Sequence, residues 1–354
     1  MENIIFNVEQ FKRNILTKNL NILIGSGVSN PAIPLMNLFL KDDKGMAVSK
    51  EIANTNLENH IWKVSSFLLW NHNDRIKYFV ENMDKKTLYS IGYLTELKNF
   101  NTLEYNIGYV LERYVKFLEK VITLLYTSNS RTVSKSVNIF TTNYDLFIES
   151  SLDLLMKNEN FIFNDGSNGY FHKVLDSSNY NKSVAYRGLN ENYLNELPSI
   201  SLIKPHGSMN WEKCENNQIL IRPCTVNHPV IVRPTGLEGQ ETYLNNHFHD
   251  MLRVFQLELD KPQSVLIVIG FSFQDDHIAK MIRRALKNPE LMIYIFCYAD
   301  RDFDVIKKNL SLDNIPRNIQ IVTPSDLEVE NQNTLSTSGN FDISSLTKLF
   351  IVEE

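Results

Sequence analysis

The sequence predicts an α/β protein in which a doubly wound, mostly parallel sheet carries helices on both faces. Short, continuously apolar runs rich in β-branched residues are typical of strands buried on both sides of such a sheet. These runs lie at residues 21–25, 137–142, 264–270 and 291–297, with a weaker fifth at 319–323. A helical pattern follows each of the first four runs, and this alternation indicates a Rossmann-like sheet.

The clearest of these helical patterns follows Gly270. Apolar residues recur there at helical spacing, with Asp275 and Asp276 at the start and basic residues near the end, where each charge suits the helix dipole. The apolar members are Ile278, Met281, Ile282, Ala285 and Leu286. We therefore expect a helix directly after these two acids.

Residues 38–136 differ from the rest of the chain. They contain few β-branched runs, one long amphipathic pattern at 103–125, and shorter helical patterns at 61–70 and 76–83. We interpret this interval as a helical insertion, so that residues 1–37 and 137–354 form the α/β domain. Two polar segments complete the prediction, an irregular connection at 161–198 and a mobile linker at 331–340.

Composition excludes several classes of protein. A net charge of −5 and a pI near 6.0 argue against a protein whose main work is to neutralise nucleic-acid phosphates. Three cysteines, Cys214, Cys224 and Cys297, are a poor disulfide framework. Residues 1–10 lack a secretory pattern, and the longest apolar run, 265–269, is far shorter than the roughly 20 residues that span a bilayer. We expect a cytoplasmic protein with no membrane contact.

The first motif that could carry chemistry is Gly25-Ser26-Gly27-Val28-Ser29, directly after the first predicted strand. Glycines at a strand-to-helix turn let backbone N–H groups approach a phosphate. A tight turn without a ligand is the alternative. The dehydrogenase fingerprint is absent, because it needs a third glycine and an acid after a second strand, whereas Asp42 and Asp43 lie in a polar run.

The second motif, Thr141-Thr142-Asn143-Tyr144-Asp145, ends the second predicted strand. Open α/β sheets bind ligands at this edge, and an asparagine amide can both donate and accept hydrogen bonds to a ribose hydroxyl or a water. Asp145 precedes an apolar helical run, so its simplest role is to cap that helix. We favour Asn143 for the site and the cap for Asp145.

Two further motifs contain histidines. His206 lies in Lys204-Pro205-His206-Gly207-Ser208, after an apolar run, and is either a surface residue or a group that transfers protons near neutral pH. Gly270 and Ser272 follow the third strand and could meet the adenosine half of a nucleotide, or only end the strand. We interpret His277 as a residue of the first turn of the following helix.

In this order, the four motifs resemble the sirtuin (Sir2) family, and specifically its bacterial antiphage-defence branch. The first is similar to that family's Gly-Ala-Gly-x-Ser cofactor loop and the second to its Thr-Gln-Asn-x-Asp segment. Pro205-His206-Gly207 is similar to the segment with its catalytic histidine, and residues 270–277 to its late glycine–serine loop. The resemblance covers the α/β core and says little about residues 38–136.

Carried over residue by residue, the resemblance implies an NAD site. Asn143 would bind the nicotinamide ribose or the attacking water, and His206 would be the base. Gly270 and Ser272 would lie near the adenosine ribose. The remaining residues implied to hold NAD are Gly25, Ser26, Gly27, Val28, Ser29, Thr142 and Asp145.

The chain departs from protein-deacylating sirtuins in two ways. Their zinc ribbon needs four thiolates in two Cys-x-x-Cys pairs, and this chain has three cysteines and no such pair, so we expect no zinc. Their Ile-Pro-Asp-Phe-Arg segment is replaced, since Leu35 and Met36 follow Ile33-Pro34. His247 and His249, two apart on a helix expected at 241–259, do not share a face, and we interpret them as surface residues.

The resemblance therefore implies an NAD hydrolase that releases nicotinamide and ADP-ribose, or a cyclic form of it. Its biological role would be NAD depletion in antiphage defence by abortive infection. A separately encoded HerA-like ATPase would be the partner, and nucleic acid would be contacted only through that complex. Three alternatives stay open: an NAD-dependent protein deacylase, a nuclease or nucleic-acid-binding subunit, and a non-catalytic NAD-sensing module.

Aromatic residues of the insertion suggest an assembly surface. We expect the insertion to roof the ligand edge, and its aromatics either fill a small core of its own or become buried between copies. They include Trp62, Phe67, Trp70, Tyr78 and Phe79. We therefore expect a homo-oligomer.

Overall fold

The computed structural model of the protein describes residues 6–41, 46–70, 102–127, 134–187, 194–233, 246–328, 335 and 339–351. The helical pattern at 76–83 and nearly all of the linker at 331–340 lie outside these residues. So do Tyr78, Phe79 and the side chain of Trp70.

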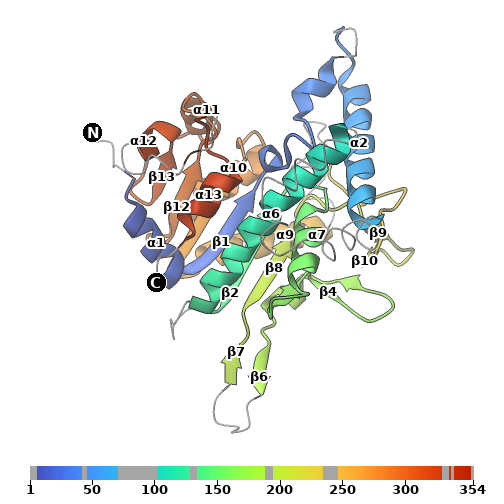
Figure 1. Ribbon diagram of the computed structural model, residues 1–354, viewed down its shortest axis with the longest axis horizontal. Helices are drawn as coiled ribbons and strands as arrows, with labels where there is room; N and C mark the ends of the chain where they lie inside the picture. Colours follow the sequence, from blue (N-terminus) through green and yellow to red (C-terminus); the bar gives the residue numbers. More distant parts are fainter. Residues whose placement is uncertain are drawn as a thin grey trace.

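A seven-stranded sheet forms the centre of the molecule (Figure 1). All six pairings between its neighbouring strands are parallel. In spatial order the strands are β13 (Ile319–Val322), β12 (Met292–Phe296), β11 (Ser264–Ile269), β1 (Asn19–Ile24), β2 (Ser136–Thr141), β8 (Ser199–Ile203) and β3 (Ile162–Asn164). The predicted α/β, Rossmann-like fold class is confirmed, and the five predicted strands are all in this sheet.

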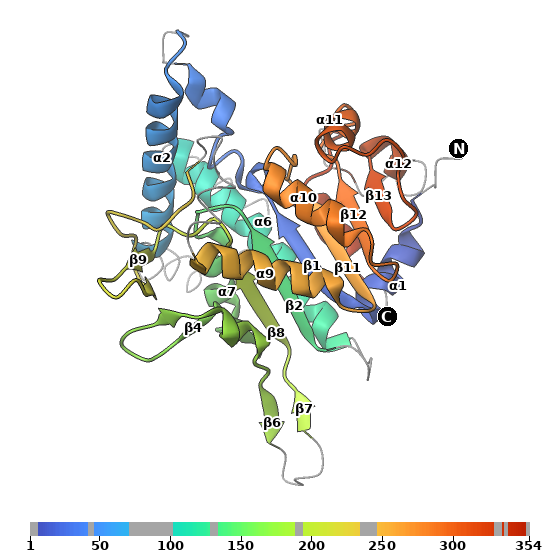
Figure 2. The same cartoon turned by 180° about the vertical axis from the view of Figure 1, so that it is seen from behind.

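Helices cover both faces of the sheet because successive strand residues point to opposite sides. Ile22 and Ile24 of β1 face one core, while Leu23 faces the other. The first face packs against α1 (Val8–Thr17), α2 (Lys50–Trp70), α6 (Thr102–Thr127), α7 (Phe147–Leu155) and α13 (Ile343–Leu349). The second, seen in Figure 2, packs against α9 (Asn246–Asp260), α10 (Asp276–Ala285) and α11 (Asp302–Asn309).

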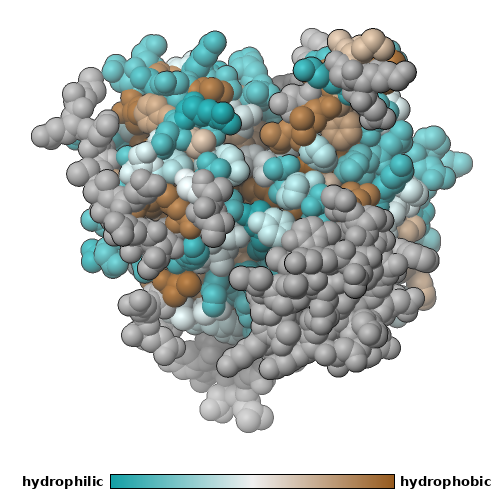
Figure 3. All heavy atoms as spheres, turned by 45° about the horizontal axis from the view of Figure 1, so that its top comes forward, coloured by the Kyte–Doolittle hydropathy of each residue, from teal (hydrophilic) through white to brown (hydrophobic). Residues whose placement is uncertain are grey.

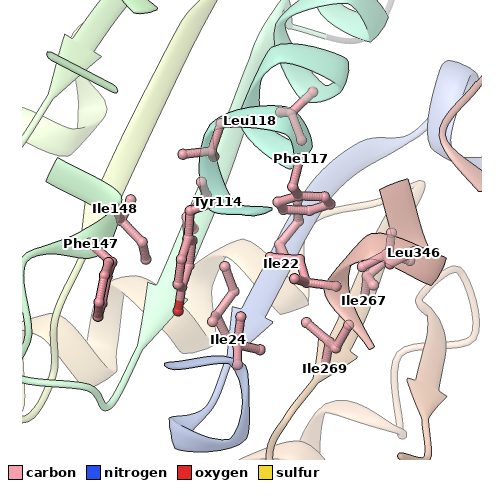
Figure 4. Close-up of a cluster of buried hydrophobic side chains, with 14 of the residues drawn as sticks. Ile22, Ile24, Tyr114, Phe117, Leu118, Phe147, Ile148, Ile267, Ile269 and Leu346 are labelled. Carbon is pink, nitrogen blue, oxygen red and sulfur yellow. The ribbon is translucent and has the colours of Figure 1, made fainter. Parts of the chain in front are cut away.

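The long amphipathic pattern at 103–125 forms α6, as predicted, and this helix crosses the sheet. Its residues Tyr114, Phe117 and Leu118 lie over Ile22 and Ile24 of β1 (Figure 4). Apolar residues of α2 belong to the same core cluster. The two helices thus share the core of the sheet, and the division of the chain at residues 38 and 136 stays a prediction.

Two local predictions were wrong, and one further strand of the sheet was not predicted. Residues 161–198 are not an irregular connection, because they supply the edge strand β3 and several short strands, among them β4 (Ser167–Asn168) and β5 (Val174–Leu175). The apolar run before His206 is a full strand of the sheet, β8. After β1 the chain forms a short 3-10 helix, η1 (Ser26–Ser29), instead of an α-helix. Short edge strands leave a weak apolar pattern, which explains the error at residues 161–198. β8 is internal and fully buried, but two of its five residues are serines, which weakens its apolar run.

The order of the strands places a switch point between β1 and β11. From β1 the chain continues to β2 and β8 on one side, and β11, β12 and β13 follow on the other. Open α/β sheets bind ligands outside the carboxyl ends of the strands at such a point. No described helix is long and apolar enough to cross a membrane.

Candidate functional site

The structure brings all four motifs to the carboxyl edge of the sheet. They follow β1, β2, β8 and β11, which are neighbours in the order β11-β1-β2-β8. Phe140 of β2 pairs with Ile203 of β8, so Asn143 and His206 each come three residues beyond the same level of the sheet. The loops that carry them are joined, because Met209 N–H donates to the Tyr144 carbonyl at 3.0 Å.

The loops after β1 and β11 are in direct contact at the switch point. Gly25 N–H donates to the Ile269 carbonyl at 2.9 Å, and Gly27 N–H donates to the Gly270 carbonyl at 3.0 Å. A Cβ on Gly25 would lie 2.3 Å from the Gly270 carbonyl oxygen, so only glycine permits this approach. Both amides are engaged within the protein, and the role of these glycines toward NAD stays a prediction.

The rest of the β1 loop is partly open to solvent. Ser26 and Gly27 are exposed, whereas Val28 and Ser29 are buried. Ser29 Oγ donates to Asp145 Oδ2 at 2.9 Å and lies 3.2 Å from the Tyr114 hydroxyl. Through Ser29, this loop therefore connects the switch point to the residues that follow β2 by hydrogen bonds.

Asn143 is held in one orientation by the end of β1. Its Nδ2 donates to the Gly25 carbonyl at 3.2 Å and to Ser29 Oγ at 3.3 Å. Its backbone N–H donates to Thr141 Oγ1 at 3.1 Å, and half-buried Thr142 lies between the two. Asn143 Oδ1 is buried and has no hydrogen-bond partner in the part of the chain that the structure describes. A buried acceptor of this kind is costly unless something binds it, which is the property expected of a ligand-binding oxygen.

Asp145 combines two roles. Asp145 lies one residue before the N-cap of α7, Leu146, instead of at the cap itself, and its Oδ1 accepts from the N–H of Phe147, the first residue of the helix, at 3.2 Å. Its Oδ2 accepts from Ser29. Burial raises the pKa of Asp145, while the charge of Lys204 opposes this shift. Asp145 therefore both accepts a hydrogen bond from the start of α7 and belongs to the buried network beneath Asn143.

Tyr114 joins this network from α6, and the sequence reading missed it. The side chain is fully buried, and its ring stacks on Phe147 with centroids 5.6 Å apart (Figure 4). Burial and the neighbouring Asp145 carboxylate raise the pKa of the Tyr114 phenol well above its ordinary value, so the hydroxyl stays protonated. Tyr114 was missed because it belongs to the apolar face of an amphipathic helix, where a tyrosine is usually interpreted as a core residue.

Lys204 is a second residue that the sequence reading left without a role. It is 2% exposed, and its Nζ donates to three oxygens. These are the Asp145 carbonyl at 2.6 Å, Glu149 Oε1 at 2.8 Å and Ser208 Oγ at 2.9 Å. Because an ammonium group has three protons, every donor is used and the cation joins the β8 loop to α7.

His206 is buried and faces a second histidine. The Nε2 atoms of His206 and His277 are 2.8 Å apart, and the two side chains are almost fully buried. Burial, followed by the nearby His277, lowers the pKa of His206 to about 3, so its imidazole is neutral at physiological pH. His277 does lie in the first turn of α10, as expected, but the sequence reading missed this contact. The signal available in the sequence was that the His206 motif and the His277 motif each follow a short apolar run, so both could lie at the same edge of the sheet.

The turn after His206 requires glycine. Gly207 has φ +87°, and a Cβ there would lie 1.9 Å from the Val230 carbonyl oxygen. Its neighbour His206 is fixed on the other side by the Val232 N–H, which donates to the His206 carbonyl at 2.8 Å. The backbone around the histidine is thus set by packing against the 230–232 segment.

Other predicted residues lie apart from this buried network. The Ser272 side chain is exposed and Gly270 is half-buried, and their placement near an adenosine ribose stays a prediction. His249 is exposed as expected, but the prediction for His247 was wrong, because its side chain is half-buried beside Phe248. Its Nε2 has no hydrogen-bond partner among the described residues. Among the described residues, no group of three or more His, Cys, Asp or Glu side chains could hold a metal ion.

The lowered pKa of His206 predicts how stability depends on pH. Between about pH 6.5 and about pH 3, the unfolded chain binds a proton that the folded protein excludes from His206. The free energy of unfolding should therefore fall with acidification, by up to about 1.4 kcal/mol per pH unit for this proton. Urea titrations at several pH values measure this slope. His206→Gln should reduce it and the exposed His249→Gln should not; equal slopes in wild type and His206→Gln would contradict the prediction.

Comparisons with known proteins identify the family. No curated protein matches the chain. The family model of the SIR2-like domain matches residues 137–315, just over half of the 354-residue chain. The match contains Asn143, His206 and His277, and the fold brings the β1 loop, which precedes the matched segment, against it. The chain belongs to the SIR2-like domain family, whose members use NAD.

Proposed function

We propose that the protein is an NAD hydrolase that cleaves NAD to nicotinamide and ADP-ribose, with Asn143 and His206 as its catalytic residues. One observation carries the proposal. Among the described residues, Asn143 Oδ1 is a buried acceptor without a partner, while both bonds of its Nδ2 fix the amide in place. This oxygen lies at the carboxyl edge of the sheet, where open α/β sheets commonly bind ligands.

The chemistry needs what this edge supplies. Breaking the bond between nicotinamide and the ribose C1′ carbon builds positive charge on that carbon, and a fixed carbonyl dipole stabilises such charge. The Asn143 amide oxygen can also accept a proton of the attacking water or of a ribose hydroxyl and so orient it. His206 is neutral and has a ring lone pair for that proton, although burial, which lowers its pKa to about 3, makes the imidazole a weak base in the unliganded protein. Water supplies the hydroxyl group that ends on ADP-ribose, and one proton is released.

Protein deacylation is the competing reaction of this chemistry. Both reactions begin with loss of nicotinamide, and they differ in whether water or an acyl-lysine oxygen attacks the ribose. We favour water because the three cysteines of the chain are too few for the zinc ribbon of the deacylases. Cys297 is also buried in the core after β12.

Product analysis tests the proposed function. The purified protein is incubated with NAD alone, with NAD and an acetyl-lysine peptide, and with NAD and a chelator, and the products are separated by chromatography. We expect nicotinamide and ADP-ribose, or its cyclic form, in all three mixtures, at equal rates and with the peptide unchanged. Peptide-dependent release of nicotinamide would show a deacylase, binding without turnover would show a sensor, and loss of activity on chelation would overturn the metal-free reading.

We further propose that the reaction serves antiphage defence by depleting NAD, under the control of a HerA-like ATPase and in a homo-oligomer. The resemblance of the four motifs supports the role and the partner. Apolar side chains near η2 (Met36–Leu40) and the start of α2 support assembly, since Leu38, Met46 and Ile52 are each more than half exposed. Figure 3 shows apolar groups among polar ones on the visible face. Co-purification tests the association with the ATPase, and light scattering tests the homo-oligomer. A monomer without a partner in both experiments would contradict both proposals.

A further inference from the structure

The contact between His206 and His277 joins two loops that are distant in the sequence. His206 follows β8, and His277 follows β11 on the other side of β1 and β2. Their rings lie 5.0 Å apart between centroids, inclined by 31°, and their Nε2 atoms are at hydrogen-bonding distance. One ring must therefore donate an N–H to the other, because two neutral imidazoles share a single proton along this line.

Only one of the two arrangements leaves His206 able to act as a base. If His277 donates, the His206 Nε2 lone pair is occupied, and its Nδ1 carries the remaining proton. If His206 donates its Nε2–H to His277, the lone pair on His206 Nδ1 is free. A general base needs a free lone pair, so the productive tautomer of His206 is the one that donates to His277.

The place of His277 at the start of a helix suits a neutral acceptor. It lies in the first turn of α10, where the helix dipole disfavours a positive charge. The neighbouring Asp276 is the charged group closest in sequence, but its carboxylate is exposed and bonded to Lys280 at 2.5 Å and to Arg283 at 3.8 Å. A neutral His277 can accept from His206 without burying a charge of its own.

We propose that His277 is the positioning residue for His206, holding the imidazole in the tautomer and orientation that leave Nδ1 basic. The inference rests on the proposed NAD hydrolysis and adds a residue to it. In the reaction, a water or ribose O–H proton moves to His206 Nδ1, and the resulting imidazolium keeps donating Nε2–H to His277. The proton on Nδ1 later leaves His206 for solvent, and it is the one proton that hydrolysis releases.

Steady-state kinetics of three variants test this role. His277→Ala should lower kcat by about 10- to 100-fold, the loss typical when the hydrogen-bond partner of a functional histidine is removed, with little change in KM. His277→Gln offers an acceptor oxygen and should recover part of the rate. His249→Ala, an exposed histidine outside the network, should match wild type. Circular dichroism melts confirm that each variant is folded.

A nitrogen NMR measurement tests the tautomer without using activity. In wild type, the histidine ¹⁵N spectrum should show His206 protonated at Nε2, and the His277→Ala spectrum should show a mixture of tautomers. Protonation of His206 at Nδ1 in wild type would overturn the proposal. A kcat of His277→Ala close to that of wild type would also overturn the proposal. A kcat above that of wild type would overturn it as well and would show that the contact between the two histidines is inhibitory.

The outcomes separate the two levels of inference. If wild type releases no nicotinamide from NAD, the proposed function fails, whatever the spectrum of His206 shows. The alternative result is that wild type cleaves NAD, that His206→Ala abolishes cleavage and that His277→Ala leaves the rate unchanged. In that case the proposed function stands and only the role of His277 fails.

Discussion

Asn143→Ala is expected to lower kcat for NAD cleavage by about 10³-fold, the upper range for the loss of one preorganised dipole at a reacting centre. The variant removes the buried Oδ1, and because this atom has no partner among the described residues, its loss leaves none of their donors unsatisfied. It also frees the Gly25 carbonyl and Ser29 Oγ from one bond each. Nicotinamide release and thermal melts measure the two effects separately.

The matched control is Asn138→Ala. Asn138 lies on β2, five residues before Asn143, and its Nδ2 donates to Asn21 Oδ1 and to Glu258 Oε2, both at 3.0 Å. This variant removes a half-buried amide of the same type but leaves the carboxyl edge intact, so it should reduce stability and keep kcat. Asn143→Ala with a kcat within about threefold of wild type would remove Asn143 from the mechanism.

Lys204→Met is expected to reduce the free energy of unfolding by about 3–5 kcal/mol, because it leaves a buried carboxylate without its cation. Glu149 Oε1 receives its ion pair from Lys204, and burial already raises the pKa of Glu149 against the effect of that cation. The Asp145 carbonyl and Ser208 Oγ lose a donor as well. Denaturant titration measures the change.

Two further variants show whether the buried charge is the cause. Adding Glu149→Gln to Lys204→Met removes the unpaired carboxylate and should restore part of the stability. Lys280→Met breaks the ion pair with Asp276, in which both side chains are 65% exposed, and should cost at most about 1 kcal/mol. Equal losses for Lys204→Met and Lys280→Met would show that Lys204 contributes as an ordinary surface cation.

Strands buried on both faces of the sheet could be predicted closely. β11 and β12 are apolar at nearly every position, and β1 and β2 each contain a short run of large apolar residues, so the limits of all four strands were predicted to within two residues. β3 was not predicted, because its three residues are all half-buried and one of them is Asn164. A short edge strand owes its structure to the strand beside it, here β8, more than to its own pattern.

The candidate site divides in the same way. Asn143 and His206 each follow an apolar run, which is a signal that the sequence alone contains. Tyr114, Lys204 and His277 come from a helix stripe, a strand end and a helix turn, and each pattern has an ordinary structural explanation. Their partners, Ser29, Glu149 and His206, lie tens of residues away in the chain.

The sequence by itself determined the fold class, most strands of the sheet and the edge where a ligand would bind. These depend on apolar periodicity and on residues at strand ends, which are local properties of the chain. Only the tertiary structure decided which polar groups meet at that edge. The order β11-β1-β2-β8 brings His277 to His206, and α6 carries Tyr114 to Ser29. Such contacts depend on strand order and helix packing, so no spacing along the chain contains them.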